Sequence, residues 1–357
     1  MEKIKVLMCG SKLHVKGGMV SVIKNYLSYD EWDNYEITYI PTHTENTTHS
    51  RIDKLITLIY FCVEYIRIFA IISLKKFSIA HLHTAERGSF YRKALLVKLL
   101  KKFDVKVVMH HHGAEFDEFY DGLSIRKKQF VCDILEQVDL NIVLSNKLIS
   151  MIKNKAPNAN VSVLYNAVQT YEKNLYNSEA RNCMFLGRLG KRKGAYDLIE
   201  AIEHIDDKLP SDVRFYFCGD GEIDNILDKI EKSDIGHRIA YVGWIDSEQK
   251  TQLLNKIAVN ILPSYNEGLP MAILETMAYG IPSISTDIAS IPEVVIDGKT
   301  GCLIKPGDVS ALEDAILKMF LDEEYRLKCS QESYNLISQN FDLKRNIQIL
   351  KSIYKGL

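Results

Sequence analysis

Short apolar segments rich in Val and Ile alternate with longer stretches of helical periodicity along almost the whole chain. Apolar strands that alternate with helices are typical of a parallel sheet covered by helices on both faces. In the first half, the pattern predicts strands at residues 5–9, 36–40, 79–83, 105–110, 140–144 and 161–164, and helices at 19–27, 52–74, 90–101 and 125–137.

A polar stretch at residues 169–181 interrupts this alternation and has the composition of an interdomain linker. The alternation then resumes, with strands predicted at 183–187, 214–218, 239–242, 259–262 and 283–285, helices that begin at 195, 222 and 270, and helices at 312–320 and 343–354. Because 357 residues suit about two domains, we predict an α/β protein of two doubly wound parallel-sheet domains.

The charge balance excludes a nucleic-acid binder driven by bulk positive charge, since 45 Lys and Arg nearly cancel 46 Asp and Glu. The balance is uneven, however: residues 1–165 carry 23 basic and 17 acidic side chains. This excess favours an anionic partner for the first half, such as a membrane face. Seven cysteines without a C-x-x-C pair predict reduced, mostly buried thiols in a cytoplasmic protein.

Two segments bear on membrane association. Residues 55–72 are nearly long enough to span a bilayer, but Glu64 and Arg67 would each cost about 2.5–3.5 kcal/mol at its centre. A buried or membrane-lying helix is therefore favoured, with a spanning helix as the alternative. Residues 92–103 mix leucines with five cations, which suits a helix lying on anionic lipid or an ordinary helix with a hydrated cationic face.

Ligands of doubly wound sheets bind at the carboxyl ends of the strands. After the strand at 183–187, Arg188 and Lys193 flank a strand-to-helix loop, where two cations suit phosphate oxygens; a hydrated basic loop is the alternative. Gly219, and Gly243 with Trp244, follow the next two strands and permit close approach of a ligand to the backbone. Plain turns and simple packing remain the alternatives there.

The loop that ends in Pro270 is the most informative stretch. Pro270 is predicted as the first residue of a helix, where its missing N–H costs nothing. Glu267 precedes that helix, and Glu275 lies in its apolar stripe, where a carboxylate needs partners such as ligand hydroxyl groups or a buried structural group. The free N–H groups near Leu269 and Met271 favour an anion at the helix start.

In the first half, Gly17 and Gly18 precede a predicted helix and suit phosphate or sugar oxygens or, equally, a tight turn. Three adjacent histidines end the strand at 105–110. Because successive side chains alternate, His110 and His112 share one side of the strand, and the three histidines cannot all bind one metal. No metal is expected. A histidine acting as donor or proton shuttle and a structural histidine both remain open.

Glu267-Gly-Leu-Pro followed by Glu275 resembles the E-x7-E signature of retaining glycosyltransferases of family 4, whose GT-B fold has two Rossmann-like domains facing across a cleft. The resemblance continues in order through Gly17-Gly18, His112-Gly113, Asn166-Ala167-Val168, Gly187-Arg188, Lys193-Gly194 and Gly219-Asp220-Gly221. Asn166-Ala167 departs from the commoner Asn-Gly. The resemblance implies an acceptor domain at residues 1–167, a nucleotide-sugar domain at 168–338, and a C-terminal helix at 339–357 that crosses back to the first domain.

The resemblance also implies the roles of individual residues. Arg188 and Lys193 would hold the donor diphosphate, Glu275 the ribose, and Glu267 the transferred sugar, while His112 would contact that sugar near the reacting carbon. The rest of the implied donor site consists of Gly18, Gly219, Gly243, Trp244, Gly268, Leu269, Pro270 and Met271. Attack is expected on the front face, so Glu267 is not taken as a nucleophile. The chain has no D-x-D motif, and no cofactor or metal is expected.

The expected function is transfer of a sugar from a UDP-sugar, or second a GDP-sugar, to a glycan or lipid-linked glycan in bacterial surface-polysaccharide synthesis. The expected location is the cytoplasm, with peripheral binding to the inner face of the membrane as a hypothesis. Alternative functions are a sugar-nucleotide epimerase, a phosphorylase, or a non-catalytic glycan-binding module. A Rossmann oxidoreductase is disfavoured because the first turn lacks G-x-G-x-x-G.

Overall fold

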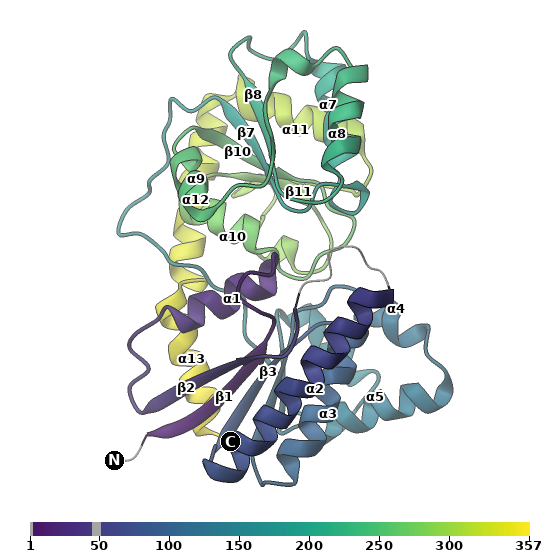
Figure 1. The fold of residues 1–357 in the computed structure, drawn as a ribbon. Helices are drawn as coiled ribbons and strands as arrows, with labels where there is room; N and C mark the ends of the chain where they lie inside the picture. The colour runs from purple at the N-terminus through teal and green to yellow at the C-terminus, as the bar shows by residue number, and fades with distance from the viewer. Residues whose placement is uncertain (1–2, 45–50) are drawn as a thin grey trace. The chain divides into compact units, whose positions relative to one another are not determined.

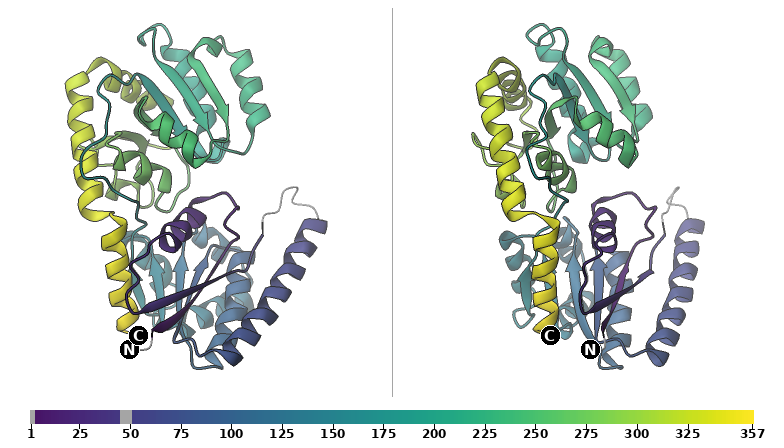
Figure 2. Two further views of the ribbon diagram at one scale, coloured as in Figure 1. Left: turned by 60° about the vertical axis from the view of Figure 1, so that its left-hand side comes forward. Right: turned by 90° about the vertical axis from the view of Figure 1, so that its left-hand side faces the viewer.

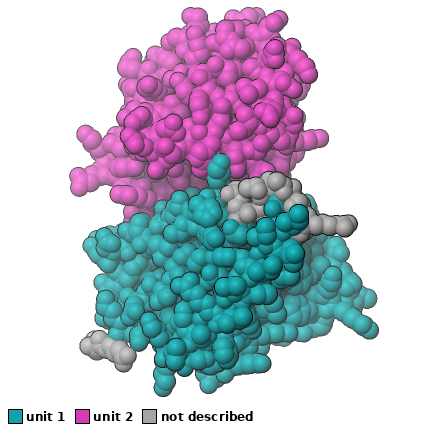
Figure 3. Space-filling model, viewed as in Figure 1, with its two compact units in different colours: residues 1–166, 344–357 teal, residues 167–343 magenta. Residues whose placement is uncertain are grey.

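The computed structural model describes residues 3–44 and 51–357 (Figure 1). The chain divides into two compact units, a first unit of residues 1–166 and 344–357 and a second unit of residues 167–343 (Figure 3). Each unit is built around one six-stranded sheet in which neighbouring strands run parallel. The predicted fold class, two doubly wound α/β domains, is confirmed.

The sheet of the first unit has the order β2-β1-β3-β4-β5-β6. Its strands are β1 (Ile4–Gly10), β2 (Tyr35–Pro41), β3 (Ile79–Thr84), β4 (Lys106–His111), β5 (Leu140–Val143) and β6 (Val161–Val163). Its helices are α1 (Gly18–Leu27), α2 (Arg51–Leu74), α3 (Gly88–Lys101), α4 (Phe116–Asp121), α5 (Ile125–Gln137), α6 (Ile149–Lys153) and α13 (Leu343–Lys355), with a 3-10 turn at Asn146–Leu148.

Different helices cover the two faces of this sheet. Leu7 and Met109 belong to a buried cluster that α2, α3 and α5 complete, so these three helices cover one face. On the opposite face, Tyr26 of α1 and Tyr354 of α13 both pack against His81 of β3. Both views in Figure 2 show α2 as a long helix on the outside of the first unit.

Helix α3 packs one side into the core of the first unit and exposes Lys98 and the C-cap residue Lys102, which fits the alternative of an ordinary helix with a hydrated cationic face. Leu96, Val97 and Leu100 are completely buried. Lys93 is only 1% exposed and donates a hydrogen bond to the Thr42 hydroxyl. Burial lowers the pKa of Lys93 to about 7. Three of the four leucines and the charge of Lys93 therefore point toward the protein, whereas Leu95 is 48% exposed.

The sheet of the second unit has the order β12-β11-β10-β7-β8-β9. Its strands are β7 (Asn182–Leu186), β8 (Arg214–Cys218), β9 (Ile239–Gly243), β10 (Ile257–Leu262), β11 (Ser283–Thr286) and β12 (Gly301–Ile304). Its helices are α7 (Ala195–Ile205), α8 (Ile223–Lys232), α9 (Ser247–Leu254), α10 (Met271–Ala278), α11 (Val309–Leu321) and α12 (Glu323–Asn340), with 3-10 turns at Lys191–Lys193, Gly236–Arg238 and Ile291–Glu293. Strand β12 was not predicted.

All seven cysteines are free and five of them are buried, as expected.

Candidate functional site

The loops that follow β7 and β10 lie side by side because these two strands are neighbours in the sheet. The backbone N–H of Tyr265 donates to the Arg192 carbonyl at 2.9 Å, and the Arg192 guanidinium donates to the Asn266 carbonyl at 3.1 Å. A Cβ on Gly194 would come within 2.1 Å of the Pro263 carbonyl oxygen. Only glycine therefore permits this close approach of the two loops, which bring the sequence-predicted Lys193 and Glu267 together.

Lys193 and Glu267 form an ion pair whose side chains are 14% and 8% exposed. The Ser264 hydroxyl donates a second hydrogen bond to the same carboxylate oxygen at 2.9 Å. Burial lowers the pKa of Lys193, and the neighbouring Glu267 carboxylate opposes that shift. Ser264 was not predicted, and its only signal in the sequence is its place three residues before Glu267. The arrangement holds one ammonium group at the sheet edge and keeps it close to a fixed carboxylate.

Arg188, at the carboxyl end of β7, is exposed. Within the part of the chain that the structure describes, its guanidinium makes no ion pair. Its side-chain stem lies over Gly221, where a Cβ would be 3.0 Å from Arg188 Cγ. A Cβ on Gly219 would come within 1.8 Å of the Gly187 carbonyl oxygen, so close backbone packing alone accounts for glycine at position 219. Arg188 is thus a cation available to an external anion.

Helix α10 begins at Met271, with Pro270 as its N-cap, one residue later than predicted. No side chain caps this helix start. The N–H groups of a first helical turn have no acceptor inside the helix, and the helix dipole adds positive potential there. Leu269 and Met271 are 4% and 5% exposed, so the start of α10 is enclosed by protein. An anion that reached the start of α10 would therefore meet a favourable potential.

Glu275 of α10 has a protein partner, which was one of the two alternatives left open for it. Lys250 of α9 donates to the Glu275 carboxylate at 2.7 Å, and the two side chains are 27% and 22% exposed. Helix α9 is positioned by a capping box between Asp246 and Gln249. Lys250 was not predicted, because its approach to Glu275 depends on how α9 packs. The pair remains partly accessible, so a ligand hydroxyl can still reach the carboxylate.

Gly243 and Trp244 close the edge strand β9. Gly243 has a φ of +147°, a conformation that disfavours other residues, and its carbonyl accepts a hydrogen bond from the Gly219 N–H at 2.7 Å. The Tyr241 hydroxyl donates to the Trp244 carbonyl at 2.7 Å. The Trp244 side chain is nevertheless 47% exposed. It offers a flat aromatic surface at the carboxyl end of β9, as Arg188 offers a cation at the carboxyl end of β7.

In the first unit, the predicted alternation of the three histidines is confirmed. His111 hydrogen-bonds to Asn141 at 3.0 Å on one face of the sheet, whereas the rings of His110 and His112 lie 4.3 Å apart on the other. His110 is fully buried and His112 is half-buried at the strand end. Of the two, His112 is the one that a ligand can approach. Gly17, with a φ of +140°, and Gly18 lead into α1 as predicted.

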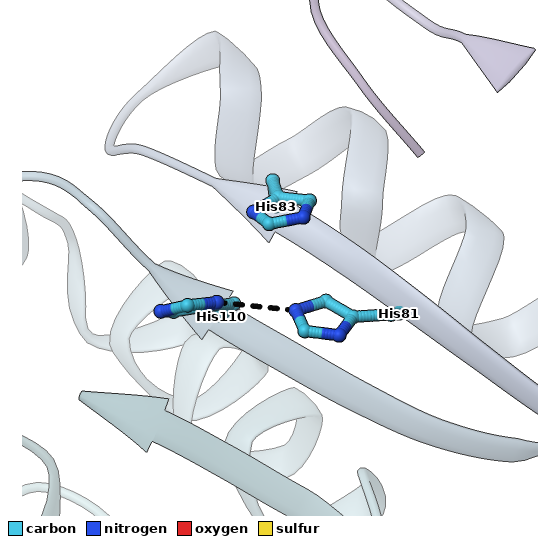
Figure 4. A group of neighbouring side chains, drawn as sticks. All are labelled: His81, His83 and His110. Carbon is cyan, nitrogen blue, oxygen red and sulfur yellow. Dashed lines mark hydrogen bonds between the residues drawn. The ribbon is translucent and has the colours of Figure 1, made fainter. Parts of the chain in front are cut away.

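Two histidines of β3 join this group and were missed in the sequence. His83 Nδ1 lies 2.8 Å from His112 Nε2. His81 Nε2 lies 3.1 Å from His110 Nδ1, a contact that Figure 4 shows. The Tyr354 hydroxyl lies 2.6 Å from the other ring nitrogen of His81, Nδ1. The signal was the spacing of two residues between His81 and His83, but only the pairing of β3 with β4 brings them beside His110.

The nitrogens of His81, His83 and His110 lie within 4.8 Å of one another, which raises the question of a metal site. The rings of His81 and His83, however, are stacked, with an angle of 17° between their planes and centroids 4.5 Å apart. Imidazole nitrogens bind metals in the plane of the ring, so parallel stacked rings do not direct their lone pairs at one ion. The four imidazoles therefore form a stack with hydrogen bonds between rings, in which His83 contacts His112.

This histidine stack predicts loss of stability in mild acid. Burial lowers the pKa of His81 and His112 from 6.5 to about 3 and shifts the pKa of His83 and His110 in the same direction. Below pH 6.5 the unfolded chain therefore binds more protons than the folded chain. The free energy of unfolding then falls by roughly 1.4 kcal/mol per pH unit for each fully buried histidine. The melting temperature should fall between about pH 7 and about pH 5, less steeply for His81→Gln. Equal slopes for the variant and the parent would contradict the role of the stack.

Three comparisons place these features beside known proteins. Residues 169–336 match the family model of glycosyl transferases group 1. The chain is 27% identical over 95% of its length to an uncharacterized 41.2 kDa protein in the cps region of Klebsiella pneumoniae, of which 97% is covered. It is 30% identical over 178 residues, 50% of this chain, to 42% of the putative teichuronic acid biosynthesis glycosyltransferase TuaC of Bacillus subtilis. The fold matches Anabaena HepE in complex with UDP-glucose, with a TM-score of 0.75 at 16% identity over 99% of this chain and 100% of that one.

Proposed function

Because this chain belongs to the group 1 glycosyltransferases and has the GT-B fold, we propose that it transfers a sugar from a UDP-sugar, with retention of anomeric configuration, to a glycan or lipid-linked glycan. The choice of UDP is supported by the likeness to HepE, whose structure holds UDP-glucose. A role in surface-polysaccharide synthesis is supported by the relatives in the cps region of Klebsiella pneumoniae and in teichuronic acid biosynthesis.

The observation that carries the proposal is the positive edge of the second unit. Arg188 has no carboxylate partner in the described chain, Lys193 is enclosed beside Glu267, and the start of α10 has no side-chain cap. Arg presents a planar fork that suits phosphate oxygens, while Lys acts as a compact charge. These groups together match a diphosphate, which carries several negative oxygens.

Sugar transfer requires the bond between the anomeric carbon and the diphosphate oxygen to break. Negative charge then develops on the departing nucleoside diphosphate, and donors already in place stabilise that charge at no further cost of reorganisation. Arg188, Lys193 and the first N–H groups of α10 would supply this stabilisation. The acceptor hydroxyl attacks from the same face, and the leaving phosphate oxygen takes its proton. Glu267, already held by Lys193 and Ser264, would orient the sugar rather than attack it.

The remaining roles follow from accessibility. The Glu275 carboxylate is partly exposed beside Lys250 and would accept hydrogen bonds from the ribose hydroxyls. The half-exposed Trp244 and the backbone at Gly243 would contact the base. His112 would hydrogen-bond to the transferred sugar through Nδ1, because its Nε2 already lies 2.8 Å from His83 Nδ1. The reaction is proposed to take place in the cytoplasm, where nucleotide sugars and lipid-linked acceptors are both available.

The test is transfer from UDP-glucose, UDP-galactose and UDP-N-acetylglucosamine to membrane-extracted glycolipids, followed by NMR of the product. The expected result is release of UDP with an axial linkage from an axial donor, unchanged by EDTA. Donor incubated without acceptor serves as the control for epimerisation. An inverted linkage, an epimerised donor or a requirement for a divalent cation would each contradict the proposal, and binding without turnover on any acceptor would favour a glycan-binding module.

A further inference from the structure

The outward side of α2 is the largest concentration of exposed apolar side chains on the described part of the chain. Nine of the 22 large apolar residues that are exposed there belong to this one helix, with exposed fractions between 49% and 86%. We call them the α2 outer face: Ile52, Leu55, Ile56, Leu58, Ile59, Val63, Ile66, Phe69 and Leu74. Soluble proteins rarely expose so many large apolar side chains side by side unless the patch binds something.

The inward side of the same helix is apolar as well. Phe61, Ile68 and Ile72 are 3%, 0% and 6% exposed and belong to the core of the first unit. Residues 55–74 are long and apolar enough to cross a bilayer by length and composition alone. Because one side of α2 is committed to the protein core, the folded unit leaves α2 lying along its surface rather than crossing a membrane. The sequence of α2 is thus apolar on both sides, because the inward side packs in the core and the outward side is suited to contact a partner.

The charges around the α2 outer face indicate an anionic partner. Within residues 55–74 the only charged side chains are Glu64, which is 8% exposed, and Arg67, which is exposed and lies 3.4 Å from it. Lys75 and Lys76 are exposed directly after the helix ends. Lys102 is also exposed near that end, since the ring of its neighbour Phe103 packs against Phe69 at 5.9 Å.

The first unit as a whole carries 27 Lys and Arg against 17 Asp and Glu, whereas the second unit carries 18 against 29. Asp104, two residues after Lys102, is an acidic side chain close to these cations in sequence. A second copy of the same positive surface would repel this one, whereas anionic headgroups are attracted at about 1 kcal/mol per basic residue near the surface. The combination of an apolar stripe and flanking cations therefore fits lipid better than self-association.

We propose that the α2 outer face binds the surface of an anionic phospholipid membrane. The helix lies in the plane of the interface, with Ile59, Val63 and Ile66 among the acyl chains and Arg67, Lys75 and Lys76 at the headgroups. The proposed sugar transfer does not require this binding, but it would bring the first unit to a membrane where lipid-linked acceptors reside. The two proposals can therefore fail separately.

The test is sedimentation of the full chain with vesicles of equal parts phosphatidylglycerol and phosphatidylcholine, beside vesicles of phosphatidylcholine alone. The triple variant Ile59→Ser, Val63→Ser and Ile66→Ser should partition into the mixed vesicles more than about tenfold more weakly. The matched control removes three equally large exposed apolar residues outside α2, through Ile125→Ser, Leu227→Ser and Leu321→Ser, and should bind as the parent does. Lys75→Glu with Lys76→Glu should weaken binding to the mixed vesicles about tenfold and remove most of its salt dependence.

Folding and donor binding are followed in every variant by thermal unfolding and by UDP titration, which reports on the second unit. Loss of vesicle binding with UDP binding intact supports the proposal independently of the enzyme's activity. The proposal is overturned if the parent chain does not sediment with the mixed vesicles at about 0.15 M salt, or if the triple variant binds as the parent does. It is also overturned if the triple substitution instead separates a dimer of the chain that does not bind vesicles.

Discussion

Replacing Lys193 with alanine is expected to lower kcat of sugar transfer by about a hundredfold to a thousandfold, the range seen when one group that stabilises developing negative charge is removed. Lys193 is 14% exposed, whereas Arg188 is exposed, so water screens the charge of Lys193 only weakly. The substitution also leaves the Glu267 carboxylate without its cation, which adds repulsion toward the departing phosphate. Steady-state kinetics with a saturating UDP-sugar measures the loss.

Lys191→Ala provides the matched control for this prediction. Lys191 occupies the same 3-10 turn as Lys193 but is exposed, and it makes no ion pair within the described residues. Its removal should change kcat less than about twofold, because water already screens an exposed charge. If the two variants lost activity equally, the effect would come from the net charge of the loop. The enclosed position of Lys193 would then not be the cause.

Glu275→Ala is expected to weaken donor binding by about tenfold to a hundredfold, which corresponds to the loss of hydrogen bonds to a charged acceptor. The carboxylate would bind the ribose hydroxyls from α10, and its removal also leaves Lys250 with an unpaired charge at the same place. Isothermal titration with UDP measures the change. Because the ribose stays bound to the nucleotide in both the ground and the transition state, KM should rise more than kcat falls.

Lys250→Met separates the two contributions to that loss. If Lys250 only positions the Glu275 carboxylate, the single Lys250→Met variant should bind UDP about threefold to tenfold more weakly, and Glu275→Ala combined with it should bind no more weakly than Glu275→Ala alone. Additive losses would show that Lys250 contacts the nucleotide itself. UDP binding that is unaffected by Glu275→Ala would contradict the ribose-binding role.

Much of the fold could be predicted from the sequence, because the strands of a parallel sheet are apolar on both faces and stand out as short unbroken runs. The placement of the candidate site's residues in the second unit was predictable for the same reason. Once β7 and β10 are recognised, Lys193 and Glu267 follow them directly and must meet at one edge. The predicted start of α10 at Pro270 is one residue too early, because proline is suited both to the position just before a helix and to its first position.

The contacts that depend on packing between distant elements were not predictable. Lys250 reaches Glu275 from another helix, and His81 reaches His110 only through the pairing of two strands. The sequence also did not show which apolar side chains of α2 and α3 would be exposed. Helix α3 buries three of its four leucines and even Lys93, whereas α2 exposes nine large apolar side chains. Composition reports how apolar a helix is, but only the structure shows which of its sides has a partner.

The central claim is that Arg188, Lys193 and the start of α10 bind the diphosphate of a nucleotide sugar. Titration of the parent chain and of the Arg188→Ala, Lys193→Ala double variant with UDP and with uridine tests it most directly. We expect the parent to bind UDP at least about a hundredfold more tightly than uridine and the double variant to lose most of this difference. Equal affinity of the parent for UDP and uridine, or a preference for UDP that survives the double substitution, would contradict it.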